Sequence, residues 1–380
     1  MTLIAKAAAP GAVSSAPVSS AIKVTPDNAR QVLAGLPRFV RMGMRIVLGL
    51  DYGRLTITTP DGRCFLIEGK HPGPDGVVSV HDWRFVRMAV EGGDVGVGEA
   101  FMLGYWSSPD VTTFLELFCV NRDATEKKLQ GSALFRIAIS IRHWFNRNTR
   151  KGSKRNISAH YDLGNAFYRE WLDPSMTYSS GLYEGRAATL EEAQTRKYRA
   201  LAEAADIRPG HKVLEIGCGW GGFAEFAARE VGAHVKALTI SREQFDYARE
   251  RMFKAGLNDR VEVVFQDYRD ERGVYDRIAS IEMFEAVGRA YWPTYFEKLA
   301  TCLKPGGMAG LQIITIQDRM FADYARRPDF IQRYIFPGGM LPPPGKLTEI
   351  GGKTGLDLKA QKIFGQDYAR TLAEWRDRFR

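Results

Sequence analysis

The segment 212–228, KVLEIGCGWGGFAEFAA, constrains the fold more than any other part of the chain. Lys212–Ile216 is a short apolar run typical of a strand, and the pattern from Phe223 onward is helical. A glycine-rich turn lies between them and lets the backbone approach a ligand closely. Its glycines are Gly217, Gly219, Gly221 and Gly222. Strand, glycine turn and helix together are typical of a nucleotide-cradling element in an α/β fold.

The acidic residue near the end of the predicted strand bears on the ligand. Glu215 suits a site that receives the cationic amino group of an amino acid better than one that receives a pyrophosphate. Gly217, Gly219 and Gly222 also satisfy the dinucleotide fingerprint, so an NAD enzyme is one alternative. A tight turn in a fold without a ligand is another.

Three later segments favour S-adenosylmethionine (SAM) over NAD. The predicted strand at 235–238 ends in hydroxyl and amide side chains that suit a nucleoside. The predicted strand at 261–265 ends in an acid and a tyrosine that suit adenine, and LKPGG at 303–307 precedes another strand. This order resembles the class I SAM methyltransferases. The polar residues concerned are Thr239, Ser241, Gln244, Asp267 and Tyr268.

Composition limits the class of protein. A chain of 380 residues is long enough for two domains, and 45% hydrophobic residues is ordinary for a globular protein. No stretch reaches the ~18 apolar residues of a membrane span. Four widely spaced cysteines without metal-ligand spacing predict reduced thiols in a cytoplasm and no metal site.

We expect four segments along the chain. Residues 1–27 predict a disordered tail, 28–125 a smaller α+β domain that associates with lipid, 126–156 a basic linker, and 157–380 a catalytic domain of alternating strands and helices. Hydrophobic periodicity in the α+β domain predicts the following elements. The strands are near 45–50, 54–58, 64–68 and 76–80, and the helices are at 29–36, 82–91 and 110–121.

The formal charge of +9 is concentrated in the segment 121–155, which holds ten Lys or Arg and two acids. The run LFRIAISIRHWF at 134–145 is apolar at helical spacing and has aromatic residues at its edge. An anionic membrane surface attracts such a segment at ~1 kcal/mol per basic residue close to it. A solvated linker is the alternative. No RNA- or DNA-reading motif accompanies the segment, so we expect no nucleic-acid partner.

Several longer strings occur in an order typical of one family. They are SAHYDLGNAFYREWLDPSMTYSSGLY at 158–183, VLEIGCGWGG, LTISREQ, QDYRD, YDRIASIEMFEAVG at 275–288, LKPGG, RYIFPGG and FGQDYARTLAEWRDRF. With them the chain resembles the cyclopropane-fatty-acyl-phospholipid synthases, including the branch that modifies mycolic acids. The resemblance implies a Rossmann-like class I SAM methyltransferase domain, preceded here by the smaller N-terminal α+β domain.

The resemblance also implies an activity, namely C-methylation of a cis double bond in an unsaturated acyl chain of a membrane phospholipid, with closure of a cyclopropane ring. Methylation of the same alkene without ring closure, which gives a methyl-branched or methylene chain, is the alternative. A lipid- or SAM-binding protein without activity is a third possibility. We further expect a cytoplasmic homodimer that binds peripherally to the anionic inner face of a bacterial membrane.

The family motifs imply two sets of site residues. The SAM site comprises Tyr178, Ser179, Glu215, Ile216, Gly217, Cys218, Gly219, Trp220, Gly221, Gly222, Thr239, Ser241, Gln244, Asp267 and Tyr268. The family closes the ring with bicarbonate as a base, held by a cysteine, a glutamate, a histidine, an isoleucine backbone group and a tyrosine. The matching glutamate, isoleucine and tyrosine are Glu285, Ile314 and Tyr368.

Two of the five bicarbonate positions depart from the family. Ser180 stands at the position of the cysteine, and Gln312 stands at the position of the histidine. Both side chains still form hydrogen bonds, so an anion could remain bound. Neither is a proton relay near neutral pH as histidine is, which places the ring-closing half of the reaction in question.

Overall fold

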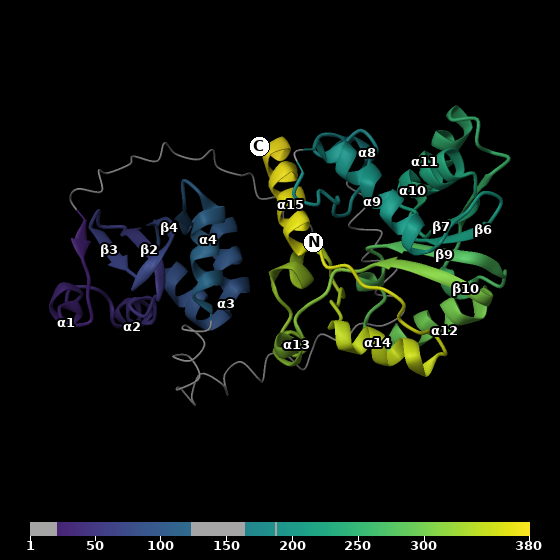
Figure 1. Cartoon of the computed structure of the whole chain (residues 1–380). Helices are drawn as coiled ribbons and strands as arrows, with labels where there is room; N and C mark the ends of the chain where they lie inside the picture. The colour runs from purple at the N-terminus through teal and green to yellow at the C-terminus, as the bar shows by residue number, and fades with distance from the viewer. Residues whose placement is uncertain (1–20, 123–163, 187) are drawn as a thin grey trace. The chain divides into compact units, whose positions relative to one another are not determined.

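A computed structural model describes residues 21–122, 164–186 and 188–380, and the chain divides into two compact units, Met1–Asn146 and Arg147–Arg380 (Figure 1). Each unit has its own sheet and its own hydrophobic core. The predicted basic linker at 126–156 lies outside the described residues.

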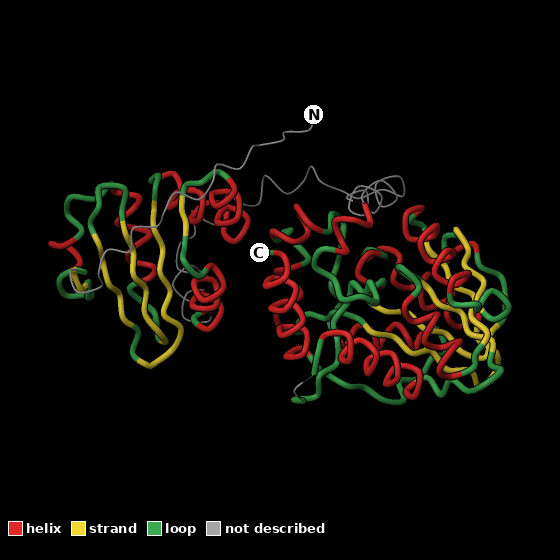
Figure 2. The backbone as a smooth tube through the Cα atoms, turned by 90° about the horizontal axis from the view of Figure 1, so that it is seen from above, coloured by secondary structure: helices red, strands yellow, loops and turns green. Residues whose placement is uncertain are grey.

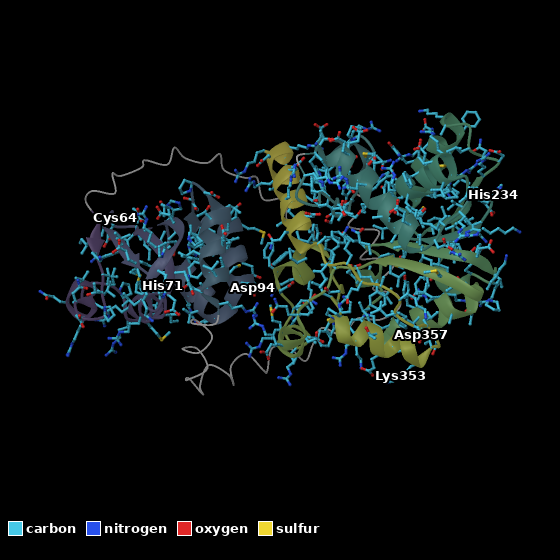
Figure 3. All side chains as sticks on the ribbon, in the orientation of Figure 1. Cys64, His71, Asp94, His234, Lys353 and Asp357 are labelled. Carbon is cyan, nitrogen blue, oxygen red and sulfur yellow. The ribbon has the colours of Figure 1, made fainter. Side chains whose placement is uncertain are left out.

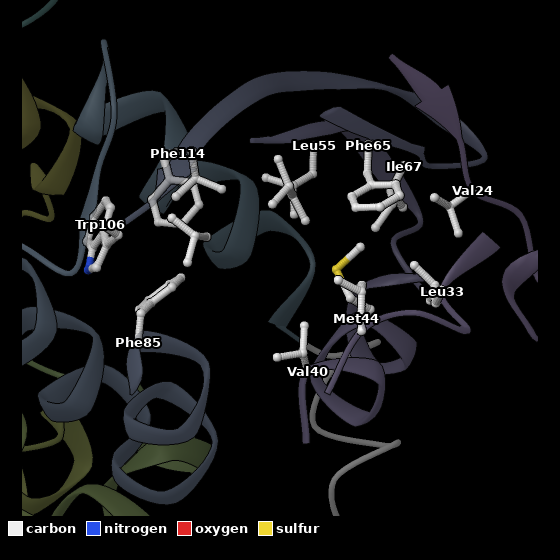
Figure 4. Packing of buried hydrophobic residues seen from close by; sticks show 14 of the residues in the cluster. Val24, Leu33, Val40, Met44, Leu55, Phe65, Ile67, Phe85, Trp106 and Phe114 are labelled. Atoms are coloured by element: carbon white, nitrogen blue, oxygen red, sulfur yellow. The ribbon is translucent and has the colours of Figure 1, made fainter. Parts of the chain in front are cut away.

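The N-terminal unit is built on a mixed five-stranded sheet in the order β1-β3-β2-β4-β5. Its elements are β1 (Ile22–Lys23), α1 (Ala29–Val32), α2 (Arg38–Val47), β2 (Tyr52–Thr58), β3 (Cys64–Glu68), β4 (His71–Val80), α3 (Arg84–Met102), β5 (Trp106–Ser107) and α4 (Val111–Val120). Strand residues Leu55, Phe65 and Ile67 share a core with Val40 and Met44 of α2 (Figure 4). The predicted α+β pattern of this unit is therefore present.

Two expectations for this unit are wrong. The segment 45–50 is not a strand, because α2 continues to Val47 and buries Val40 and Met44, whose spacing of four residues is helical. The prediction of a disordered tail over residues 1–27 is wrong for the end of that segment, because β1 pairs with β3 and Val24 is buried in the core. In both cases contacts with distant residues outweighed a weak local pattern.

The C-terminal unit has a parallel five-stranded sheet in the order β10-β9-β6-β7-β8, with helices on both faces (Figure 2). The strands are β6 (Lys212–Ile216), β7 (His234–Thr239), β8 (Val261–Phe265), β9 (Tyr275–Ile281) and β10 (Leu303–Gln312). The α-helices are α8 (Gly164–Arg169), α9 (Leu190–Ala204), α10 (Gly222–Phe226), α11 (Arg242–Lys254), α12 (Trp292–Cys302), α13 (Asp318–Tyr324), α14 (Pro344–Lys353) and α15 (Gly365–Phe379).

Both faces of this sheet are buried, as a doubly wound fold requires. The neighbouring residues Val213 and Leu214 of β6 are each 0% exposed and belong to different core clusters. Val213 clusters with residues of α9 and α10, whereas Leu214 clusters with residues of α12. The central strand β6 has β7 on one side and β9 on the other, so its carboxyl end is the topological switch point where such sheets bind ligands.

The described helices include none that is both long and apolar enough to cross a membrane. Cys64, Cys119, Cys218 and Cys302 are free thiols. Within the described ranges, His, Cys, Asp and Glu side chains form no cluster able to hold a metal ion.

Candidate active site

The glycine turn follows β6 directly and has the left-handed backbone that glycine favours. Gly217, Gly219 and Gly221 have φ angles of 83°, 53° and 83°. The backbone N–H groups of Gly217 and Cys218 donate to the Leu238 carbonyl at 3.0 and 2.9 Å, which fixes the turn against β7. A Cβ atom added at Gly219 has no described atom within 4 Å. Gly219 therefore presents an open backbone surface at the switch point, whereas Gly217 and Gly222 are packed closely against Met283 and Tyr198.

Glu215 is a buried acid beside this turn. It lies in β6, is 2% exposed, and its Oε2 atom has no hydrogen-bond partner among the described residues. Burial raises the pKa of Glu215 to about 8, and the charges of Arg251 and Lys197 oppose that rise. Such a carboxyl group could receive a cationic ligand group, which is the role that the sequence analysis predicts for Glu215. Ile216, which ends β6, is packed in the core.

The polar residues after β7 form one hydrogen-bonded cluster. Thr239 Oγ1 donates to Gln244 Oε1 at 2.9 Å and accepts from the Ser241 backbone N–H at 3.1 Å. Ser241 caps α11 by accepting from the Gln244 backbone N–H. All three side chains are buried, so the structure brings these predicted nucleoside ligands together at the end of one strand.

The predicted adenine contact follows β8. Asp267 caps the short helical segment Tyr268–Asp270, and its carboxylate accepts from Arg269 Nε at 2.9 Å. The Tyr268 ring packs edge-on against Tyr295 at 5.5 Å, and burial raises the pKa of Tyr268 to about 12. An adenine ligand of Asp267 would thus share this carboxylate with Arg269.

An aromatic cluster surrounds Tyr178 in the loop between α8 and α9. Its ring centroid lies 5.2 Å from Trp171 and 5.3 Å from Trp375 of α15. Trp220 of the glycine turn packs on Tyr168 at 5.0 Å, and Tyr168 in turn packs on Tyr178 at 5.6 Å. The chain thus brings α8, the glycine turn and α15 together around one set of rings.

Ser179 is held from α9 by two side chains that the sequence analysis missed. Lys197 Nζ donates to Ser179 Oγ at 2.6 Å, and Gln194 Nε2 donates to the Ser179 carbonyl at 2.8 Å. Lys197 is buried, and burial lowers its pKa, whereas the negative charges of Glu282, Asp173 and Glu215 oppose that change. The helical spacing of Ala193, Gln194 and Lys197 on the buried face of α9 is the signal that would have found it.

Ser180 and Gln312 meet on a carboxylate that the sequence analysis also missed. Glu282 Oε1 accepts from the Ser180 backbone N–H at 2.9 Å and from Gln312 Nε2 at 2.8 Å. Glu282 follows β9 directly, and its own N–H donates to the Gln312 carbonyl at 2.8 Å. Register pairing of β9 with β10 therefore places Glu282 beside Gln312.

Glu285 follows three residues farther along and is half-buried, with its Oε2 atom buried. Its Oε1 accepts from the Ile314 backbone N–H, and its Oε2 has no hydrogen-bond partner among the described residues. Burial, and then the charge of Glu282, raises the pKa of Glu285 to about 8. Burial also raises the pKa of Tyr368 on α15, with smaller effects from Glu282, Tyr178 and Glu285. Ser180 and Gln312 thus bind the Glu282 carboxylate, and Ile314 binds the Glu285 carboxylate, while Tyr368 lies within reach of the charges of both.

The described part of this unit offers no histidine in place of Gln312. His211 precedes β6, and His234 begins β7 on the surface (Figure 3). Both lie at the amino ends of parallel strands, whereas Gln312 ends β10 at the opposite edge. A histidine proton relay is thus absent from the described site.

Comparison with known proteins gives consistent matches. Residues 148–380 match the family model described as mycolic acid cyclopropane synthetase. The chain is 38% identical over 296 residues to tuberculostearic acid methyltransferase UfaA1 of Mycobacterium tuberculosis, covering 76% of this chain and 69% of that protein. It is 35% identical over 302 residues to a cyclopropane-fatty-acyl-phospholipid synthase of Escherichia coli, covering 80% and 76%.

Two solved structures are similar to part of the chain. The cyclopropane synthase MmaA2 from Mycobacterium tuberculosis has a TM-score of 0.55 at 30% identity, and the alignment covers 59% of this chain and 82% of that one. The mycolic acid cyclopropane synthase CmaA1, complexed with SAH and CTAB, has a TM-score of 0.56 at 28% identity with the same coverage. The predicted Rossmann-like class I fold is confirmed.

Proposed function

The chain belongs to the mycolic acid cyclopropane synthetase family and is a SAM-dependent methyltransferase, and on that premise we propose that it methylates the cis double bond of unsaturated acyl chains in membrane phospholipids. The observation that carries the proposal is the open backbone at Gly219 of the glycine turn together with the buried Glu215 carboxyl oxygen, which has no hydrogen-bond partner among the described residues. A cationic amino acid group on a nucleoside, which is what SAM presents, suits both features. The cyclopropane product is the first candidate.

We place the two halves of SAM at three strand ends, those of β6, β7 and β8. Glu215 and the turn from Gly217 to Gly222 would hold the amino acid portion of SAM, and Ser179 would be kept in place for it by Lys197. The cluster after β7 and the Asp267–Tyr268 pair would hold the nucleoside. When bound, SAM supplies a methyl group on a sulfonium, an electrophile strong enough for a weakly nucleophilic alkene.

Methyl transfer leaves positive charge on a carbon of the acyl chain. The aromatic cluster around Tyr178 offers ring faces in a buried setting, and each well-placed face can stabilise a cation by ~2 kcal/mol. A proton must then leave the chain. If it leaves the incoming methyl group, its electron pair closes the ring, and if it leaves a neighbouring chain carbon, an alkene remains.

Methylation without ring closure is the second candidate function. The specific observation in its favour is that Ser180 and Gln312 replace a thiol and an imidazole at the proton-removing end of the site. Loss of the proton from a chain carbon would give a methyl-branched chain that keeps a double bond. A methylene group would form if a hydride first moved from the methylated carbon to the cationic carbon and the methyl group then lost the proton. A bicarbonate base does not fit the described contacts, because the backbone N–H groups of Ser180 and Ile314 and the side-chain amide of Gln312 already donate to protein carboxylates, and we derive no step through it.

We also propose that the enzyme works as a peripheral protein on the anionic inner face of a bacterial membrane, and as a homodimer. The support for the membrane contact is the surplus of eight positive charges in 121–155, which anionic lipid attracts. Light scattering of the purified chain measures the oligomeric state, and flotation with vesicles measures the membrane contact. A monomer, or a protein that ignores anionic vesicles, would remove these parts of the proposal.

The main experiment combines radiolabelled SAM with vesicles of cis-unsaturated phospholipid. We expect label in the acyl chain, and mass and NMR analysis of that chain distinguishes a ring from a methylene or methyl branch. Vesicles of fully saturated phospholipid are the matched control, because they lack the alkene. Equal labelling of both vesicles, or no labelling of either, would overturn the proposed function.

A further inference from the structure

We propose that Glu282 and Glu285 form a built-in carboxylate pair that receives the proton released after methyl transfer, so that the enzyme needs no bicarbonate. This inference rests on the proposed function, and it assigns the base of that reaction. Glu282 would take the place of the external anion, and Glu285 Oε2 would accept the proton.

The first observation is that protein carboxylates accept the hydrogen bonds at this end of the site. The backbone N–H of Ser180, the side-chain amide of Gln312 and the backbone N–H of Ile314 donate to protein carboxylates, whereas the Ser180 hydroxyl donates to the Gly181 carbonyl. Glu282 Oε1 takes the first two donors at 2.9 and 2.8 Å, and Glu285 Oε1 takes the third. A side-chain carboxylate therefore already makes the contacts that a bound anion would make.

The second observation is the backbone conformation of Glu282. Its φ angle is 45°, in the left-handed region that is unfavourable for a residue with a long side chain and natural for glycine. Such a strained conformation persists only where the surrounding contacts hold it in place, and it is found most often at functional sites. Here the contacts are the two hydrogen bonds to Oε1 and the backbone bond from Glu282 N–H to the Gln312 carbonyl.

The third observation is the balance of charges around Glu282. Glu282 and Glu285 are close enough that the charge of Glu282 favours the protonated form of Glu285. A third anion placed between them would add repulsion in a desolvated site, where such repulsion is strong. Lys197, the buried cation of α9, balances Glu282 instead. The charge balance therefore favours the protein's own carboxylates over an added bicarbonate.

The two carboxylates have different tasks. Glu282 Oε1 is engaged by Ser180 and Gln312, so Glu282 is a positioning residue that keeps the proton affinity of Glu285 high. Glu285 Oε2 is buried, has no described hydrogen-bond partner, and is the atom that can take a proton. The C–H bond of the cationic chain breaks, its electron pair forms the ring bond or the alkene, and the proton goes to Oε2.

The test compares methyl transfer in bicarbonate-depleted buffer, kept free of carbon dioxide, with transfer after bicarbonate is added. We expect the wild type to turn over equally in both. Glu282→Gly relieves the left-handed strain and frees Ser180 and Gln312, so its turnover should fall by ~10²-fold without bicarbonate and recover when bicarbonate is added. Glu282→Gln keeps the side-chain volume and should not be rescued.

Asp206→Gly is the matched control. Asp206 also has a positive φ, of 50°, but it precedes β6 and so lies at the amino ends of the strands, away from the site. It should behave as the wild type does. Calorimetric SAM affinity shows whether each variant is folded. A wild type that needs bicarbonate, or a folded Glu282→Gly variant that is fully active without it, would overturn the inference. A wild type that labels no unsaturated lipid would overturn the proposed function instead.

Discussion

SAM binding should release a proton from Glu215, and the structure sets the size of the effect. Burial raises the pKa of Glu215 to about 8 in the absence of ligand. A carboxyl group with that pKa is ~97% protonated at about pH 6.5, where the α-ammonium group of SAM is still charged. An ammonium group placed against Oε2 favours the carboxylate, so its pKa should fall below the working pH.

Binding should therefore release close to one proton, ~0.9 or more, from Glu215 at that pH. Isothermal titration in several buffers of different ionisation enthalpy measures the number directly, as the slope of the observed enthalpy against the buffer enthalpy. Glu215→Gln has the same size and no titratable group. The difference in slope between wild type and variant isolates Glu215 from Lys197, which also lies near the site.

A wild-type slope of zero, or the same slope in Glu215→Gln, would refute the placement of the ammonium group.

The pH dependence of stability without ligand independently checks the direction of the Glu215 pKa shift. The folded carboxyl group binds its proton more tightly than the unfolded one, whose pKa is near 4.5, so its stabilising effect is lost as pH rises from 4.5 to about 8. Urea unfolding of wild type should show this decline relative to Glu215→Gln.

Three further changes test separate parts of the molecule. Gly219→Asp should abolish SAM binding in calorimetry with an unchanged circular dichroism spectrum, because Asp tolerates the positive φ there but fills the open turn; unchanged affinity would place SAM elsewhere. Glu285→Gln should lower turnover by ~10²-fold with SAM affinity kept. Wild-type turnover should also rise with pH through about 8, since burial raises the pKa of Glu285 to that value and a base must be ionised; a variant as fast as wild type would contradict this role. Neutralising the basic segment should weaken flotation with anionic vesicles, and wild-type flotation should weaken with salt, since exposed charges are screened within ~10 Å at 0.1 M; equal binding to neutral vesicles would count against it. The residues changed to Gln are Arg147, Arg150, Lys151, Lys154 and Arg155.

Sequence alone determined the C-terminal fold and led to the residues proposed for SAM, because both follow from local pattern. The glycine turn after β6, the hydroxyl cluster after β7 and the acid after β8 each stand at the carboxyl end of a strand. Parallel strands bring their carboxyl ends to one edge, so strand order in the sequence was enough to predict that these residues meet. The same reasoning failed at 45–50, where a short apolar alternation was outweighed by helical packing of Val40 and Met44.

Only the tertiary structure decided what surrounds the reacting end of the site. Glu282 is hydrogen-bonded to Ser180, 102 residues away in the sequence, and to Gln312, 30 residues away. Neither contact leaves a pattern in the local sequence. Lys197 lies in a helix that is otherwise rich in charged residues, and only the packing of α9 shows that it is buried against Ser179. Burial and long-range hydrogen bonds set the proton affinity of a carboxyl group, and both are properties of the folded chain.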